Sequence, residues 1–158
     1  MGYIHFQDIH KDFGQNKVLK GITLDIEKGH LVTLLGPSGC GKSTLLRCLA
    51  GLEEVTSGTI SLDGKDITHV NPRDRGIGMV FQQYSLFPNM SVAQNVAFGL
   101  NMKKVPKDIV TRKVGEMLTI VGLDDKADQY PSQLSGVQQQ RVALARAIVT
   151  EPKVLLLD

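Results

Sequence analysis

The residues with the clearest chemical potential form the glycine-rich stretch Gly36-Pro37-Ser38-Gly39-Cys40-Gly41-Lys42-Ser43. It fits the phosphate-loop pattern G-x-x-x-x-G-K-S/T and lies between an apolar run, Leu31–Leu35, and a helical pattern that begins at Lys42. Glycines let backbone N–H groups curl around phosphate oxygens, and a helix N-terminus adds partial positive charge. A glycine-rich turn without a ligand is the alternative, and the combination of motif and context weighs against it. The stretch therefore predicts a nucleotide phosphate site.

The side chains of this loop have different expected tasks. Lys42 supplies a mobile positive charge for the β- and γ-phosphates, which makes it a candidate catalytic residue, and the Ser43 hydroxyl can ligate Mg²⁺. The predicted nucleotide-binding residues of the loop and the helix start are Gly36, Ser38, Gly39, Cys40, Gly41, Lys42, Ser43 and Thr44.

Composition narrows the classes of protein. The chain has 158 residues with 18 Lys+Arg against 16 Asp+Glu, a formal net charge of +2, which argues for neither nucleic acid nor an anionic membrane as partner. Hydrophobic residues make up 42%, which is enough for a packed core and excludes a disordered or fibrous chain. Cys40 and Cys48 are too few for a disulfide framework, and the N-terminus lacks the pattern of a secretion signal. We therefore expect a reduced, cytosolic setting.

The elements that must position these residues follow from the hydrophobic period. Strands are predicted at Tyr3–Asp8, Ile22–Ile26, Leu31–Leu35, Thr59–Leu62, Ile77–Phe81 and Val154–Asp158. Helices are predicted from Lys42 to about Gly51, after the N-cap Ser91, from Pro106 to Gly122, and from about Gln138 to Thr150. The third of them carries an apolar stripe of Val110, Val114, Met117, Leu118 and Val121.

Four further segments occur in a fixed order around the phosphate loop. They are Lys11-Asp12-Phe13-Gly14, Met79-Val80-Phe81-Gln82-Gln83, Leu134-Ser135-Gly136-Val137-Gln138 and Val154-Leu155-Leu156-Leu157-Asp158. Together with the loop they resemble the ATP-binding subunits of ABC transporters along the whole chain, most of all the importer ATPases of the maltose, polyamine and ferric-iron type.

The resemblance implies roles for three residues outside the loop. Phe13 matches the position that stacks on adenine, although taken alone it is also compatible with a core phenylalanine at a strand edge. Gln82 matches the glutamine that reaches Mg²⁺ or a water near the γ-phosphate and is expected to be catalytic together with Lys42. Asp158 matches the aspartate that holds Mg²⁺ through a water, so Ser43, Gln82 and Asp158 form the implied Mg²⁺ site.

The resemblance also implies a signature that acts on a second subunit. Ser135, Gly136, Val137 and Gln138 match the segment that addresses the γ-phosphate of ATP bound by the other subunit of a head-to-tail dimer. The family pattern is Leu-Ser-Gly-Gly-Gln, and Val137 departs from it. Because a β-branched side chain occupies space that glycine leaves open, we expect Val137 to weaken ATP-driven closure of the dimer.

The implied fold is α/β: a P-loop NTPase core with an N-terminal antiparallel β region and an inserted helical subdomain, incomplete at the C-terminus. Residues 1–88 are expected to form the β region and the core, 89–150 the helical subdomain with the signature, and 151–158 the Walker B strand. In the family a catalytic glutamate follows the position of Asp158. We therefore expect these 158 residues to bind ATP with little or no turnover, and to form oligomers or swapped dimers through exposed apolar surface.

The implied function is that of an ATP-binding and ATP-hydrolysing subunit, an ATPase that uses Mg²⁺ and powers solute import. Its expected partners are a second copy and a membrane permease that docks beside Gln83–Val92, and no nucleic acid is expected as a partner. This docking implies that the subunit lies in the cytoplasm on the inner face of the membrane. One alternative is a soluble ABC-type ATPase acting on nucleic acid or ribosomes. The compact segment between Gln82 and Ser135 and the nearly neutral charge disfavour it. A nucleotide-binding module without turnover is a second alternative for the chain as it stands.

Overall fold

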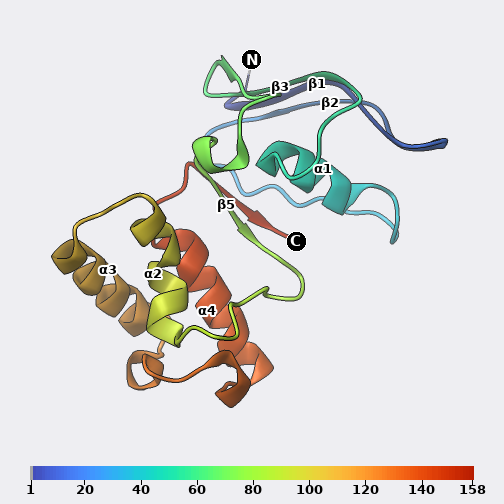
Figure 1. Cartoon of the computed structure of the whole chain (residues 1–158). Helices are drawn as coiled ribbons and strands as arrows, with labels where there is room; N and C mark the ends of the chain where they lie inside the picture. Colours follow the sequence, from blue (N-terminus) through green and yellow to red (C-terminus); the bar gives the residue numbers. More distant parts are fainter. Residues whose placement is uncertain (1) are drawn as a thin grey trace. The chain divides into compact units, whose positions relative to one another are not determined.

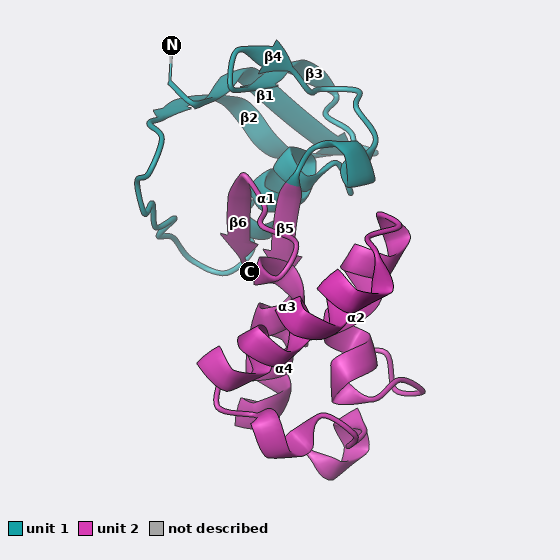
Figure 2. Ribbon diagram, turned by 90° about the vertical axis from the view of Figure 1, so that its left-hand side faces the viewer, with its two compact units in different colours: residues 1–76 teal, residues 77–158 magenta. Residues whose placement is uncertain are grey.

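The computed structural model describes residues 2–158, and the chain divides into two compact units, Met1–Gly76 and Ile77–Asp158. Figure 1 shows the order of the elements along the chain, and Figure 2 distinguishes the two units by colour. The mixture of strands and helices confirms the predicted α/β class.

Unit 1 is built on an antiparallel sheet with the strand order β2-β1-β3-β4. Its strands are β1 (Ile4–Phe13), β2 (Asn16–Ile26), β3 (Ser57–Leu62) and β4 (Lys65–Asp66). In the register of the sheet Ile4 pairs with Ile26 on one side and with Leu62 on the other. The antiparallel N-terminal β region predicted from the sequence is therefore present, and β1 and β2 extend beyond the predicted runs because they form one long hairpin.

Unit 1 also contains the helix α1 (Lys42–Ala50) and a 3₁₀ turn, η1 (Pro72–Asp74). The predicted helix after the phosphate loop is confirmed. Its buried face carries Leu45, Cys48 and Leu49, and Gly51 ends the helix in a left-handed conformation. Because α1 contacts β2, the loop that precedes the helix is held against the sheet.

The predicted strand at Leu31–Leu35 is wrong. The residues of this run have no strand structure, and the side chains of Leu31 and Leu35 are 92% and 89% exposed. An extended segment becomes a strand only when a neighbouring strand supplies hydrogen-bond partners. The described sheet of unit 1 does not include this segment. The prediction was wrong because an apolar composition suits a buried strand but does not show whether a neighbouring strand is present.

Unit 2 combines a two-stranded parallel sheet with three helices. The strands are β5 (Ile77–Val80) and β6 (Val154–Leu157), which pair in parallel from Ile77 opposite Val154 to Val80 opposite Leu157. The helices are α2 (Val92–Met102), α3 (Lys107–Ile120) and α4 (Gly136–Ile148), with short 3₁₀ turns η2 (Asp124–Lys126) and η3 (Pro131–Gln133). Among the described residues, no helix is both long and apolar enough to cross a membrane.

The core of the helical part lies where α2 contacts both α3 and α4. The predicted stripe on α3 is confirmed, since Val110, Val114 and Leu118 are buried. Ser91 is the predicted N-cap of α2: its Oγ accepts a hydrogen bond from the Gln94 backbone N–H at 3.2 Å. Helix α4 begins two residues earlier than predicted, because its own serine cap precedes Gly136.

Gly58 gives a stability prediction for the sheet. Its φ is +94°, and a Cβ atom at this position would lie 2.3 Å from the backbone oxygen of Asp8. We expect Gly58→Ala to lower the free energy of unfolding by about 3 kcal/mol or more, measured by urea denaturation, because the clash adds to the left-handed backbone cost. Gly64 is the matched control, with φ +74° but nothing within 4 Å of its Cβ position. Equal losses for the two alanine variants would contradict the close approach.

Candidate functional site

The phosphate loop turns sharply before α1. Gly39 and Gly41 have φ values of +80° and +99°, a conformation that side chains with a Cβ rarely adopt. Gly41 occupies the N-cap position, and no side chain of the described residues caps the helix start. The first amide groups of α1 therefore point into the loop, where an anion can accept hydrogen bonds from them.

The ammonium group of Lys42 is folded back over the loop. Its Nζ donates to the backbone oxygens of Gly36 and Pro37 at 2.5 and 2.9 Å and lies 3.4 Å from the Sγ of Cys40. A Cβ atom at Gly36 would lie 2.7 Å from the same sulfur, whereas one at Gly39 would meet nothing within 4 Å. The loop is thus closely packed at Gly36 and open at Gly39. The Lys42 ammonium supplies a positive charge for a phosphate group that enters the loop.

A hollow of about 480 Å³ lies between the loop and β2. Asn16, Lys17, Val18, Lys20 and Ile22 line it from β2, and Gly39 and Cys40 line it from the loop. The contact between the two elements is close, because a Cβ atom at Gly41 would lie 2.9 Å from the side chain of Leu19. The lysine side chains beside the hollow add to the positive potential of the loop.

Phe13 lies at the end of β1, at the turn of the same hairpin, with 46% of its surface exposed. The ammonium of Lys11 lies 4.8 Å from the centre of its ring and also pairs with Glu53 at 3.3 Å. An exposed aromatic ring offers a stacking surface for a base.

The two cysteines of unit 1 differ in access, which gives a labelling prediction. Cys40 is exposed in the loop, whereas Cys48 is buried on α1 and burial raises the pKa of its thiol. We expect N-ethylmaleimide to modify Cys40 alone in the folded chain, and saturating MgATP to slow that reaction about tenfold, measured by intact-protein mass spectrometry. Cys40→Ser is the control and is expected to remain unlabelled. Labelling at an unchanged rate with MgATP would contradict a nucleotide in this loop.

In unit 2 the parallel strand pair brings two predicted site residues to one edge. Gln82 follows β5 and Asp158 follows β6, and the backbone N–H of Asp158 donates to the oxygen of Val80 at 3.0 Å. The carboxyl ends of parallel neighbours meet at the same edge of a sheet, so Gln82 and Asp158 both follow the strands at this edge. Their oxygens are the ligand type that Mg²⁺ prefers. Ser43, the third predicted ligand, belongs to unit 1.

The predicted signature residues lie at the start of α4. The Oγ of Ser135 accepts from the backbone N–H of Gln138 at 3.2 Å, and the side-chain oxygen of Gln138 accepts from the N–H of Ser135 at 2.9 Å. Gly136 and Val137 form the first turn, and the valine side chain is exposed. The capping box fixes this turn, so the open end of the helix presents its amides and the Val137 side chain together.

Two polar side chains that shape the segment after Gln82, the buried Asn95 and the partly buried Arg146, were not predicted. Asn95 on α2 donates from Nδ2 to the backbone oxygens of Phe87, Met90 and Ser91, each at 3.1 Å. Arg146 on α4 donates to two backbone oxygens of the same segment. Burial lowers the pKa of the Arg146 guanidinium.

A signal for both residues was present in the helical period. Asn95 lies between Val92 and Val96 on the apolar stripe of α2, and Arg146 lies four residues after the buried Val142 on α4. A polar residue on an apolar stripe must find internal partners when the stripe is buried. The polar residues on these apolar stripes could therefore have been recognised from the sequence as candidates for buried hydrogen bonds.

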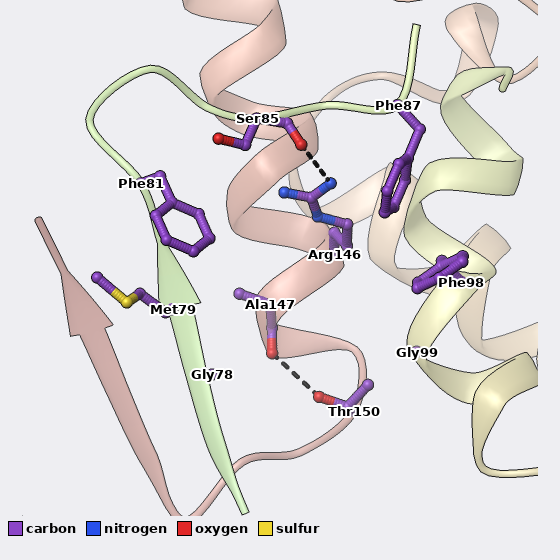
Figure 3. A pocket seen from close by; sticks show the side chains of 10 residues that line it. All are labelled: Gly78, Met79, Phe81, Ser85, Phe87, Phe98, Gly99, Arg146, Ala147 and Thr150. Carbon is purple, nitrogen blue, oxygen red and sulfur yellow. Dashed lines mark hydrogen bonds between the residues drawn. The ribbon is translucent and has the colours of Figure 1, made fainter. Parts of the chain in front are cut away.

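A hollow of about 430 Å³ opens beside this segment (Figure 3). Met79 and Phe81 line it from β5 and the residue after it, Phe87 and Phe98 from the segment and α2, and Arg146 from α4. The rings of Phe87 and Phe98 are 4.6 Å apart and tilted by 44°. The hollow is therefore mainly aromatic and apolar, with one guanidinium group.

Comparison with known proteins adds the family context. The family model described as ABC transporter matches residues 19–158. The spermidine/putrescine import ATP-binding protein of Haemophilus influenzae is 55% identical over 155 residues, which are 98% of this chain and 42% of the relative.

Relatives named for other solutes are equally similar. The Fe(3+) ions import ATP-binding protein of Vibrio cholerae is 54% identical over 156 residues, 99% of this chain and 44% of the relative. The sulfate/thiosulfate import ATP-binding protein of Thermosynechococcus vestitus is 55% identical over 155 residues, 98% of this chain and 46% of the relative. The chain thus spans less than half the length of these curated relatives.

Proposed function

Because the chain belongs to the ABC transporter family, we propose that it is part of an ATPase subunit that powers solute import through a membrane transporter. The observation that carries the proposal is the phosphate loop, in which the Lys42 ammonium lies over the loop and the uncapped start of α1 faces it. The similarity to import ATP-binding proteins supports import as the process that ATP drives. None of these names supports the alternative of an ATPase acting on nucleic acid or ribosomes.

In this proposal the nucleotide binds at the phosphate loop together with a Mg²⁺ ion. The base stacks on the exposed ring of Phe13, and the amides from Gly36 to Thr44 hold the phosphates. Ser43, Gln82 and Asp158 supply oxygens to Mg²⁺, which neutralises phosphate charge during transfer. Lys42 and Gln82 contribute to catalysis by charge and by orienting the attacking water.

We further propose that the first turn of α4 acts on ATP held by a second copy of the chain. Ser135, Gly136, Val137 and Gln138 form this turn, and its amides are suited to a γ-phosphate. The exposed side chain of Val137 lies where the second copy approaches, so it restricts closure of the dimer.

The permease is proposed to dock at the hollow beside Gln83–Val92. Its aromatic and apolar lining from Phe81, Phe87 and Phe98 suits the apolar face of a helix from a membrane subunit. Such docking places the subunit in the cytoplasm on the inner face of the membrane. In the complete protein we assign residues 1–88 and 151–158 to the nucleotide-binding core and 89–150 to a helical subdomain.

The test is reconstitution of the full-length subunit with its membrane partners in lipid vesicles. We expect ATP hydrolysis coupled to uptake of one solute, with spermidine, Fe³⁺ and sulfate as the probes because the similar proteins are named for these solutes. Hydrolysis that responds to RNA or ribosomes and ignores the membrane partners would contradict the proposal and favour the alternative.

A further inference from the structure

The segment after Gln82 contains two consecutive residues in an unfavourable backbone conformation. Tyr84 and Ser85 have φ values of +60° and +49°, in the left-handed region where a Cβ atom is crowded. Neither residue is a glycine, so contacts from elsewhere must hold this conformation.

Arg146 supplies those contacts from α4. Its Nη1 donates to the backbone oxygen of Ser85 and its Nη2 to that of Tyr84, each at 3.0 Å. Figure 3 shows the guanidinium between Ser85 and the ring of Phe87, whose centre lies 5.3 Å from the guanidinium carbon. One planar group thus contacts three residues of the segment, Tyr84, Ser85 and Phe87, which the point charge of a lysine cannot do.

The other end of the segment is attached to α2 by a different side chain. The buried Asn95 accepts from the N–H of Phe87 at 2.9 Å and donates back to its oxygen at 3.1 Å. Polar side chains of two helices therefore hold the segment, Arg146 at Tyr84 and Ser85 and Asn95 at Phe87. The two residues with positive φ lie between Gln82 and the Asn95 attachment. Removal of the Arg146 contacts releases the pair while the Asn95 attachment remains.

We propose that Arg146 is a positioning residue that ties the segment Gln83–Phe87 to α4. Arg146 lies eleven residues after Ser135 on one continuous helix, about 16 Å along its axis. A displacement of the segment at the aromatic hollow is then carried by α4 to its first turn. An effect of Arg146 on ATP hydrolysis rests on the proposed function. The attachment of Gln83–Phe87 to α4 by Arg146 does not depend on it.

Hydrogen–deuterium exchange tests the attachment in the 158-residue chain without nucleotide. We expect Arg146→Lys to speed amide exchange at residues 84–87 about tenfold, because the paired hydrogen bonds to a charged group are lost. Arg141→Lys is the matched control, since Arg141 is an exposed arginine on the same helix, and its exchange is expected to remain within about twofold of wild type. Unchanged exchange in Arg146→Lys would overturn the proposal.

A rescue variant separates this role from a general loss of stability. Glycine adopts the left-handed conformation readily, so Ser85→Gly in the Arg146→Lys background is expected to recover part of the slow exchange at residues 84–87. No recovery, together with faster exchange throughout unit 2, would show that Arg146 only stabilises the fold and would overturn the proposal.

The consequence is tested in the full-length subunit with its membrane partners. We expect Arg146→Lys to lower kcat for ATP hydrolysis about tenfold while KM for ATP stays within about twofold, because the phosphate loop is untouched. An unchanged kcat would overturn the link to α4. A wild-type subunit that hydrolyses no ATP would instead contradict the proposed function, and the exchange result would still decide the attachment.

Discussion

Replacement of Lys42 by alanine is expected to weaken MgATP binding by about 100-fold or more, because charge-assisted hydrogen bonds to phosphate are lost. In the structure the Lys42 Nζ already lies over the loop, bound to the oxygens of Gly36 and Pro37. A phosphate group offers this ammonium stronger acceptors than neutral carbonyl oxygens. The side chain therefore needs only a local movement to exchange these partners for the ligand.

The measurement is the change in anisotropy of a fluorescent ATP analogue titrated with Lys42→Ala. Lys65→Ala is the control, since it removes the same charge from β4, where Lys65 is exposed. We expect the control to bind within about twofold of wild type, because a solvent-exposed charge outside the loop adds little. Equal affinity of Lys42→Ala and Lys65→Ala would contradict the assignment of the loop.

Replacement of Arg75 by methionine is expected to lower the free energy of unfolding by about 3–5 kcal/mol, because several buried hydrogen bonds to a charged donor are lost together. Arg75 is 5% exposed, and burial lowers the pKa of its guanidinium. It donates to the backbone oxygens of Cys48 and Leu49 at the end of α1, each at 3.0 Å. It also donates to the oxygens of Thr68 and Val70 at 3.1 and 2.8 Å.

These four carbonyl groups lose the arginine as a donor in the variant, and methionine offers none in its place. Because two of them end the helix that follows the phosphate loop, the loss also reaches the nucleotide site. Urea denaturation followed by circular dichroism measures the effect. Arg73→Met is the matched control, since the Arg73 side chain is 80% exposed and pairs only loosely with Asp74 at 3.8 Å. Similar stabilities for the two variants would show that the Arg75 contacts contribute little.

The local elements of the fold were largely predictable. Ser91 before an apolar period marked the start of α2, and the glycine-rich loop marked the start of α1. The periodic residues Val110, Val114 and Leu118 identified the buried face of α3. These signals depend on residues that are close in sequence, so one sequence carries them completely.

Features that depend on distant partners were not predictable in the same way. Leu31–Leu35 has the composition of a buried strand, but a strand requires a neighbour that composition does not specify. Arg75 lies in the charged run Arg73-Asp74-Arg75, a composition typical of exposed residues. Only the fold shows that its guanidinium group binds backbone oxygens at the end of α1. The polar residues Asn95 and Arg146 stand out on the apolar stripes of their helices, but their partners are backbone oxygens, which the sequence does not identify.

The candidate site shows the same division. The phosphate loop was identified from its own residues, because spacing and chemistry coincide in eight consecutive positions. Gln82 and Asp158 were assigned through resemblance alone. The pairing of β5 with β6 supplies the physical reason for placing them together, since it aligns Val80 with Leu157 just before the two residues.

Binding of MgATP at the phosphate loop is measured by calorimetric titration of the folded 158-residue chain. Phosphate release is measured in the same samples, and circular dichroism confirms that the chain is folded. We expect saturable binding of about one MgATP per chain, with a dissociation constant in the micromolar to millimolar range and little or no turnover. A folded chain that gives no heat of binding up to millimolar MgATP would show that the loop is not a nucleotide site.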